Sequence, residues 1–141
     1  MDGGTVERSI WIAATPERVW QAVTDPALLS QWFGGGAVWE IPLLAVGATA
    51  LYEGSEVHII EVLDPPRQFT LRWEPEPPAT PTLTTFLLAP EAGGTRVTVR
   101  ESGYELLPND IRHRRMAQTD EGYRISLDHL AALLEGRERP Q

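Results

Sequence analysis

The sequence predicts a single α+β domain in which an antiparallel sheet holds one long C-terminal helix. Between residues 37 and 103 apolar and polar residues alternate with period two, which is typical of strands. The run 109–136 is the only segment long enough to cross the domain as a helix. From Asp110 to Glu135 it would measure about 39 Å at about 1.5 Å per residue. Pro108 and Asn109 favour its start and Gly136 its end.

The N-terminal part predicts one strand and two short helices. Mild alternation over 6–13 indicates the strand. Thr15 is a typical N-cap and Pro16 a typical first helical residue, so a helix is expected from Pro16 to about Thr24. The pair Asp25 and Pro26 ends it and starts a second helix. That second helix carries Leu28, Leu29, Trp32 and Phe33 and is closed by the glycines at 34–36.

Six further strands are expected, each separated from the next by turn residues. The connection 75–81 holds four prolines and cannot be a strand. With the first strand, the sheet would have about seven antiparallel strands in a meander. The six segments are 37–41, 48–53, 56–63, 68–74, 82–89 and 96–102.

Composition limits the function classes. At 141 residues and 42% hydrophobic content, the chain 1–141 is expected to form one globular domain. The net charge of -8 disfavours nucleic acids and anionic membranes as partners. Because there is no cysteine, disulfides and thiolate metal sites are excluded. Residues 1–8 lack the apolar core of a signal peptide and no apolar run spans a membrane, so a cytoplasmic protein is expected.

Aromatic side chains recur on faces that we assign to the interior. Strand alternation places Phe69, Leu71 and Trp73 on one face, and Phe86 on an equivalent face of the next strand. Such residues either fill a core or line a cavity, and for the set we expect a cavity. Its wall would be completed by Trp32, Trp39 and Tyr123. The apolar stripe of the long helix would consist of Met116, Tyr123, Leu127, Leu130 and Leu134.

Two polar residues lie at strand positions whose side chains alternation assigns to the interior. Glu101 continues the face of Val97 and Val99, and His58 continues that of Ile60 and Val62. In an apolar space either group could donate or accept a proton. The simpler alternative for Glu101 is a solvated strand end or a pair with Arg100, Arg112 or Arg115. For His58 the alternative is a solvated or hydrogen-bonded histidine near a hairpin.

The other groups of polar residues are weaker indications of a functional site. His113 and His129 have no third ligand at metal spacing, so no metal site is expected. The serines lack the context of a hydrolytic nucleophile. The basic cluster Arg112, Arg114 and Arg115 is interpreted as a solvated face, and secondarily as a clamp for an anionic ligand head group.

Several motifs together resemble a known family. They are the segment 10–33 with Thr15-Pro16-x-x-Val19-Trp20, Asp25-Pro26 and Trp32-Phe33; Ile60-Glu61-Val62-x-x-Pro65-Pro66; Phe69-x-Leu71-x-Trp73; Gly94-Thr95-Arg96-Val97-Thr98-Val99; and Glu121-Gly122-Tyr123-x-x-x-Leu127-x-x-Leu130. In this order they are similar to the activator of heat-shock-protein-90 ATPase homologue family, of the START-like (SRPBCC) helix-grip superfamily. The resemblance implies a curved antiparallel sheet around the long helix and an elongated apolar cavity between them. Between Ile41 and Glu53 the chain departs from the family's basic residue and Gly-Gly pair, so a loop near the cavity mouth is expected to differ.

The leading functional hypothesis is the binding of a hydrophobic, aromatic or lipid-like small molecule without a cofactor. An alternative is an enzyme like the polyketide cyclases and dehydratases of the superfamily, using Glu101 or His58. A further alternative is a co-chaperone that regulates a chaperone ATPase, ranked last because single-domain members lack the separate N-terminal domain of such activators. A homodimer is left open. The expected ligand-binding residues are Trp32, Trp39, His58, Leu71, Trp73, Phe86, Glu101, Tyr104, Met116 and Tyr123.

Overall fold

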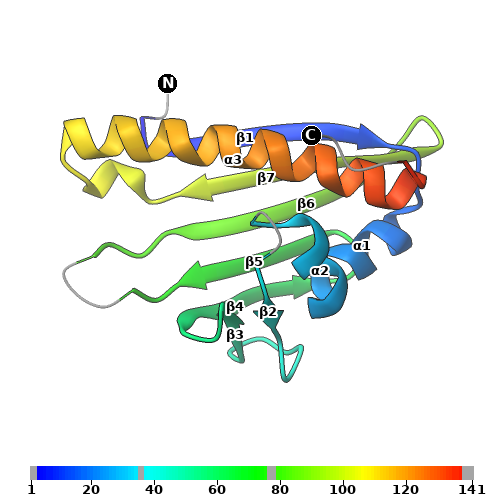
Figure 1. The fold of residues 1–141 in the computed structure, drawn as a ribbon, viewed down its shortest axis with the longest axis horizontal. Coiled ribbons are helices and arrows are strands. Elements are labelled where there is room, and N and C mark those ends of the chain that lie inside the picture. The colour runs from blue at the N-terminus through cyan, green and yellow to red at the C-terminus, as the bar shows by residue number, and fades with distance from the viewer. Residues whose placement is uncertain (1–2, 35–36, 76–78, 138–141) are drawn as a thin grey trace.

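The computed structural model describes residues 3–34, 37–75 and 79–137. It contains a seven-stranded antiparallel sheet that curves around a long C-terminal helix, with two short helices after the first strand (Figure 1). The strands are β1 (Thr5–Ile12), β2 (Trp39–Glu40), β3 (Thr49–Tyr52), β4 (Glu56–Asp64), β5 (Gln68–Trp73), β6 (Leu83–Glu91) and β7 (Gly94–Ser102). The helices are α1 (Pro16–Thr24), α2 (Pro26–Trp32), the 3-10 turn η1 (Tyr104–Leu106) and α3 (Asn109–Glu135).

The sheet has the predicted meander topology. Its strand order is β1-β7-β6-β5-β4-β3-β2, so every strand from β2 to β7 pairs with its neighbour in sequence and β1 closes the far side against β7. The tightest hairpin joins β6 to β7 through Ala92 and Gly93, both with positive φ (49° and 80°). Two such residues form the turn whose twist matches paired strands.

Two details of the sheet differ from the sequence-based expectation. The strand expected over 37–41 is reduced to Trp39 and Glu40; Pro42, two residues after Glu40, has no N–H with which to extend the pairing. In β4 the register shifts between Ile60 and Val62. The bulge reverses the parity beyond it, so Leu63 rather than Val62 packs against the core. The assignment of Val62 to the face of His58 was therefore wrong.

The two short helices begin as predicted. Thr15 Oγ1 accepts a hydrogen bond from the Arg18 N–H (3.2 Å), and Asp25 Oδ1 accepts one from the Ala27 N–H (3.0 Å). The indole N–H of Trp32 donates to the Ala22 carbonyl (2.8 Å), which ties α2 to α1. The glycines at 34–36 expected to close α2 lie partly outside the described residues; Gly34 itself has φ 81°.

The long helix packs against the core only over its second half. Its buried residues begin at Tyr123 and continue through Leu127, Leu130 and Leu134. The preceding residues are mostly charged or polar, and of these only Met116 packs against the core, partly buried. Gly136, at φ 69°, ends the helix as predicted. Among the described residues no helix is long and apolar enough to cross a membrane.

Polar contacts fix the position of α3. The guanidinium of Arg8 on β1 donates to both carboxylate oxygens of Asp120 (2.8 and 2.9 Å) near the middle of the helix. At the C-terminal end, the Ala13 N–H donates to Glu135 (3.0 Å) and Arg18 donates to the carbonyl of Leu134 (2.8 Å). The second half of the helix is therefore anchored, and the first half extends over the sheet.

Candidate functional site

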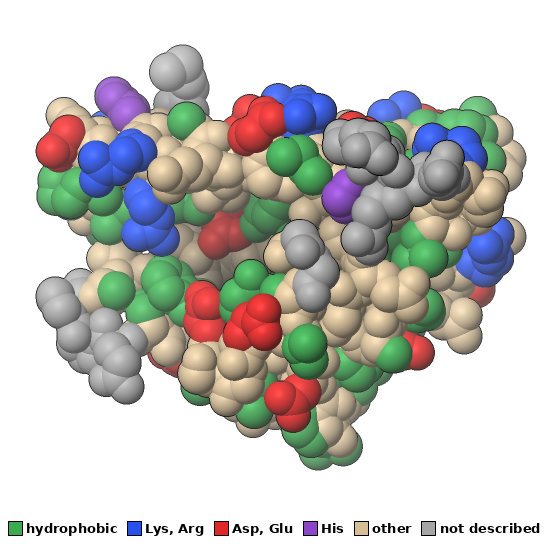
Figure 2. Space-filling view, viewed as in Figure 1, with side chains coloured by type: hydrophobic (Ala, Val, Ile, Leu, Met, Phe, Trp, Pro, Cys, Tyr) green, Lys and Arg blue, Asp and Glu red, His purple; other side chains and the backbone are tan. Residues whose placement is uncertain are grey.

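A cavity of about 570 Å³ lies between the sheet and α3, whose lining residues run from Arg115 to Ser126. Figure 2 shows it as a hollow below the helix. It exists because the polar residues before Tyr123 offer no apolar stripe that could pack the helix onto the sheet. The volume lies within the roughly 300–1,000 Å³ typical of small-molecule sites.

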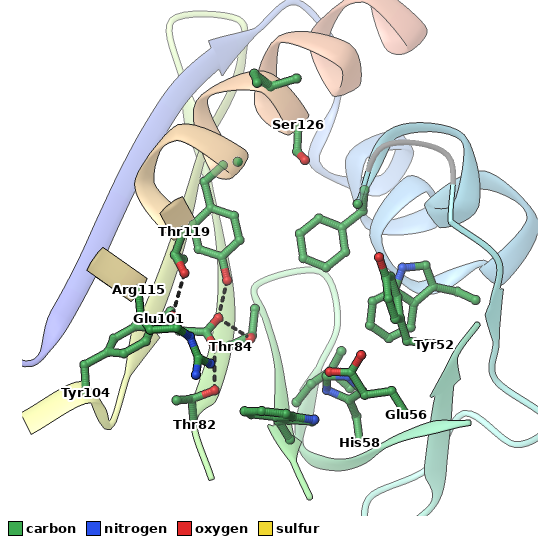
Figure 3. A pocket seen from close by; sticks show the side chains of 18 residues that line it. Tyr52, Glu56, His58, Thr82, Thr84, Glu101, Tyr104, Arg115, Thr119 and Ser126 are labelled. Carbon is green, nitrogen blue, oxygen red and sulfur yellow. Dashed lines mark hydrogen bonds between the residues drawn. The ribbon is translucent and has the colours of Figure 1, made fainter. Parts of the chain in front are cut away.

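A carboxylate with three hydroxyl donors forms one end of the cavity. Glu101 on β7 accepts hydrogen bonds from Thr82 Oγ1 (2.5 Å), from Thr84 Oγ1 (2.6 Å) and from the Tyr123 hydroxyl (Figure 3). The register pairs Thr84 with Glu101 across β6 and β7, and α3 supplies Tyr123. Hydrogen bonds to an acceptor that carries charge are the stronger kind. The side chain of Glu101 is therefore held in one orientation.

Two tyrosines lie near this carboxylate, and one of them, Tyr123, donates a hydrogen bond to it. Burial raises the pKa of Tyr123 well above its ordinary value, and the nearby Glu101 raises it further. The pKa of Tyr104 is raised for the same two reasons, burial first. The Tyr104 hydroxyl shares a hydrogen bond of 2.6 Å with Thr119 Oγ1 on α3. Both phenols thus stay protonated at neutral pH, so neither is a base.

The opposite wall is aromatic. The rings of Phe33 and Trp39 stack with centroids 5.6 Å apart, and Tyr52 meets Trp39 edge-on at 5.1 Å. Phe33 also stacks on Tyr123 at 6.1 Å, which links this wall to the carboxylate end. Gly34 at φ 81° lets the chain pass the Tyr52 ring, because an added Cβ would lie 3.0 Å from it. The rings come from three short segments that the sheet and α2 bring together.

His58 is a neutral polar group in this wall. It is 9% exposed, and its ring lies 5.1 Å from that of Trp39. Burial lowers its pKa to about 4, so the imidazole is uncharged at neutral pH. Its Nδ1 is buried without a hydrogen-bond partner, as is Nε1 of Trp39. The site therefore contains two buried nitrogens with unused hydrogen-bonding capacity.

Two further charged residues complete the lining. The guanidinium of Arg115 lies over the Trp73 ring, 5.8 Å from its centroid. Burial raises the pKa of Glu56, Glu101 raises it further, and Arg115 opposes the rise. Among the described residues, neither Glu56 nor Arg115 has an ion pair within 4 Å. The described part of the chain brings no three His, Asp or Glu side chains together in an arrangement that could hold a metal.

The structure brings together most of the residues expected at the site, but not all of them. The residues of the expected set that line the cavity are Trp39, His58, Leu71, Trp73, Glu101, Tyr104 and Tyr123. Trp32 and Phe86 are instead fully buried against each other behind the wall, with ring centroids 5.9 Å apart. Met116 is partly buried against the core and does not line the cavity, although it shares a face of α3 with Thr119 and Tyr123.

Sequence reasoning missed several lining residues, although a signal for them exists. Thr82 and Thr84 have the same strand parity as Phe86, so they point inward opposite Glu101. On α3 most of the lining residues that sequence reasoning missed are small or polar and recur at helical spacing, namely Arg115, Thr119, Gly122 and Ser126, and Ile125 is the apolar exception. The interpretation of Arg115 as part of a solvated face was wrong, since it lines the cavity. The connection 42–47, expected near the cavity mouth, contributes no lining residue.

An antiparallel sheet that grips a long C-terminal helix, with a cavity between them, defines the helix-grip fold of START-like proteins. The chain belongs to the family described as Activator of Hsp90 ATPase homolog 1-like protein, whose pattern matches residues 13–135. A comparison with curated proteins finds no match.

Solved structures share the fold. Protein MLL2253 from Mesorhizobium loti matches with a TM-score of 0.80 and 21% identity, over 95% of this chain and 98% of its own. DynU16, from the dynemicin biosynthetic locus, matches with 0.79 and 23% identity, over 98% of this chain and 50% of its own. The Aha1 dimer from Colwellia psychrerythraea matches with 0.72 and 22% identity, over 93% and 96%. At these identities the likeness concerns the fold alone.

Proposed function

We propose that the protein binds a hydrophobic or aromatic small molecule in the cavity beneath α3. The observation that carries the proposal is a cavity of about 570 Å³ with an aromatic wall and a few converging polar groups. This combination is the usual composition of a ligand site. The aromatic wall would hold the ligand body, and Glu101 with its hydroxyl partners would orient a polar substituent.

The unpaired nitrogens of the wall support the proposal. Trp39 Nε1 and His58 Nδ1 are buried without partners. Leaving such a group unsatisfied typically costs about 1–3 kcal/mol. Unsatisfied groups are rare in cores that serve packing alone. A ligand whose binding rearranges these two rings could satisfy one or both nitrogens.

Gly122 offers a direct test. It is exposed, lines the cavity, and an added Cβ would meet nothing within 4 Å. We expect the neutral dye N-phenyl-1-naphthylamine to bind the protein saturably, and Gly122→Trp to weaken that binding about tenfold or more by covering the opening. Gly122→Ala, which adds only a methyl group with no neighbour within 4 Å, should bind as the unsubstituted protein does. Dye binding that does not saturate, or that Gly122→Trp leaves unchanged, would contradict the proposal.

The second candidate is an enzyme of the cyclase or dehydratase type. Its support is Glu101, a carboxylate inside the cavity beside a protonated phenol and across from a neutral histidine. Such groups can move protons on a bound substrate. The test is to identify the ligand that co-purifies by native mass spectrometry and to incubate it with fresh protein. Conversion that Glu101→Gln abolishes favours the enzyme; unchanged mass and tight binding favour the binding protein.

Regulation of a chaperone ATPase is the third candidate, supported by the family description alone. It predicts that adding the protein accelerates ATP hydrolysis by an Hsp90-type chaperone. An unchanged hydrolysis rate at saturating protein would remove it.

We also propose that the protein forms a homodimer. One structural neighbour is a dimer, and Leu43, Leu44 and Val46 are exposed beside the edge strand β2. Sedimentation velocity should then give a dimer that Leu43→Ser and Val46→Ser together weaken. A monomer at all concentrations would contradict this part of the proposal.

A further inference from the structure

Glu56 is an acidic residue of the cavity that has no hydrogen-bond or ion-pair partner among the described residues. It is the first residue of β4, partly buried, and Figure 3 shows its side chain directed into the cavity beside Tyr52 and His58. The described residues give it no hydrogen bond or ion pair. Removing a carboxylate from water without a partner is unfavourable, and a cation brought to it offsets that cost. The carboxylate is thus a site where a positive group would be stabilised.

The rings next to Glu56 are suited to the same kind of group. Trp39 packs against both Phe33 and Tyr52, and all three line the cavity. The face of an aromatic ring attracts a cation, most strongly where water is excluded. The face of Trp73, which is paired with His58 across β4 and β5, already carries the guanidinium of Arg115. Among the described residues no basic side chain lies over the rings of Phe33, Trp39 or Tyr52. Phe33 is stacked on Trp39 and on Tyr123, whereas Tyr52 is partly exposed and has no stacked ring partner among the described residues.

The electrostatic potential in the cavity also favours a cationic ligand. Its charged lining residues are Glu56 and Glu101 against the single cation Arg115, with His58 neutral. The pKa of Tyr52 is raised by burial and then by Glu56 and Glu53, which places negative potential at this wall. Acidic side chains are visible at the lower rim of the hollow and inside it (Figure 2). With a net charge of -8 on the whole chain, a cationic ligand is attracted and an anionic one repelled.

We infer that the ligand of this cavity carries a cationic amine on an apolar or aromatic body, with the ammonium group held between the carboxylate of Glu56 and the ring of Tyr52. The inference rests on the proposed binding function and adds the chemical class of the ligand. The body of the ligand extends along the cavity under α3 toward Glu101. The alternative polarity, a carboxylate held by Arg115, is disfavoured because such a group would face both Glu56 and Glu101.

Three naphthalene probes of nearly the same shape test the inference. They are (2-naphthylmethyl)trimethylammonium, its neutral carbon analogue 2-neopentylnaphthalene, and the anion 2-naphthylacetate. Binding is measured by displacement of N-phenyl-1-naphthylamine at fixed ionic strength. We expect the cation to bind about tenfold more tightly than the neutral analogue. The quaternary charge does not depend on pH, so the comparison reports the site alone.

Two variants test whether the preference for the cationic probe is due to Glu56. Glu56→Gln should reduce the difference between the cation and the neutral analogue to within about threefold, while the neutral analogue binds as before. Glu40→Gln is the matched control, because Glu40 is exposed on β2 next to Trp39 but outside the cavity. It should leave the tenfold preference intact. Thermal melts of both variants verify that each is folded.

The outcomes separate the inference from the function on which it rests. If the neutral analogue binds saturably and the cation binds no more tightly, the cationic ligand class is wrong and the binding function stands. A carboxylate that binds most tightly, with that affinity lost in Arg115→Gln, likewise overturns the inference in favour of an anionic ligand. If none of the three probes displaces the dye and the dye itself does not saturate, the binding function and the inference both fail.

Discussion

At the scale of single residues, Glu101 connects β7, β6 and α3. Its Oε1 accepts from Thr84 and Tyr123, and its Oε2 accepts from Thr82. Glu101→Gln keeps the shape, and a threonine hydroxyl can rotate to accept from the new amide. We therefore expect the folded state to persist with a loss of about 1 kcal/mol in unfolding free energy. Binding of ligands with a polar head group should weaken.

Replacing the same residue by an apolar one has a larger effect. Glu101→Leu leaves three hydroxyl donors without their acceptor, and we expect a loss of roughly 3 kcal/mol. Urea unfolding of both variants measures the difference, with Glu40→Gln as an exposed control. Equal stabilities of Glu101→Gln and Glu101→Leu would show that the hydroxyls find other partners and that Glu101 does not organise this end of the cavity.

His58 predicts a pH dependence of stability. Its pKa is about 4 in the folded chain and has an ordinary value of 6.5, so the unfolded chain binds the proton first as the pH falls. Above about pH 6.5 His58 is neutral in both the folded and the unfolded chain, and its full contribution to the free energy of unfolding is present. It is lost as the pH falls toward 4, by about 1.4 kcal/mol per pH unit at most. The variant His58→Phe should therefore lose less stability between pH 6.5 and 4 than the unsubstituted protein.

The control for this measurement is His113→Gln, which removes an exposed histidine of α3. Carboxylates such as Asp120 and Glu135, whose pKa values are lowered by their partners, also lose stabilising interactions on acidification. They do so equally in all three proteins. If His58→Phe and His113→Gln follow the same pH profile as the unsubstituted protein, His58 is not buried in its neutral form.

At the scale of elements, the two halves of α3 have different roles. The second half contributes buried apolar side chains such as Leu127 and Leu130 to the core. The residues of α3 before them, from Arg115 onward, cover the cavity. We expect Leu130→Ala to cost about 2–5 kcal/mol, because its side chain is fully buried. Ile125→Ala, at a site 40% exposed, should cost much less. Chemical denaturation compares the two; similar losses would contradict the division.

Removal of the whole helix tests whether the sheet is stable without it. Burial of each large apolar side chain of α3 contributes about 1.5–3 kcal/mol, and a domain has in total only about 5–15. A chain ending at Ser102 should therefore show no cooperative thermal transition. A cooperative melt of that chain would mean that the helix is an appendage to an independently stable sheet.

At the scale of the whole molecule, one core joins the sheet to all three α-helices. Unfolding is therefore expected to be a single transition, seen at the same temperature by tryptophan fluorescence and by circular dichroism. A ligand at about 100 times its dissociation constant should stabilise the fold by about 2.7 kcal/mol and raise the midpoint. The Gly122→Trp variant, whose binding is weakened tenfold or more, should be stabilised by only about 1.4 kcal/mol or less at the same ligand concentration. A response of equal size in that variant would place the ligand elsewhere.

Much of the fold follows from local sequence, and the structure confirms it. Caps at Thr15 and Asp25 start the short helices where expected, and alternation predicts the inward side of most strands, including His58 and Glu101. The bulge after Ile60 could not be predicted from alternation, because one extra residue reverses the parity without changing the composition. The shortening of the expected strand 37–41 to β2 and the turn η1 were not predicted either, because alternation does not indicate where a strand stops pairing or where a single 3-10 turn forms.

The sequence by itself determined the order of the elements, the long gripped helix and the aromatic character of the interior. These properties depend on the spacing of apolar residues along the chain, which can be observed directly in the sequence. Only the tertiary structure decided which polar groups meet. Thr82, Thr84, Glu101 and Tyr123 come together through strand register and the return of α3, over separations of 17 to 22 residues from Glu101. The cavity also belongs to that level, because unfilled volume depends on how far the first half of α3 stands from the sheet.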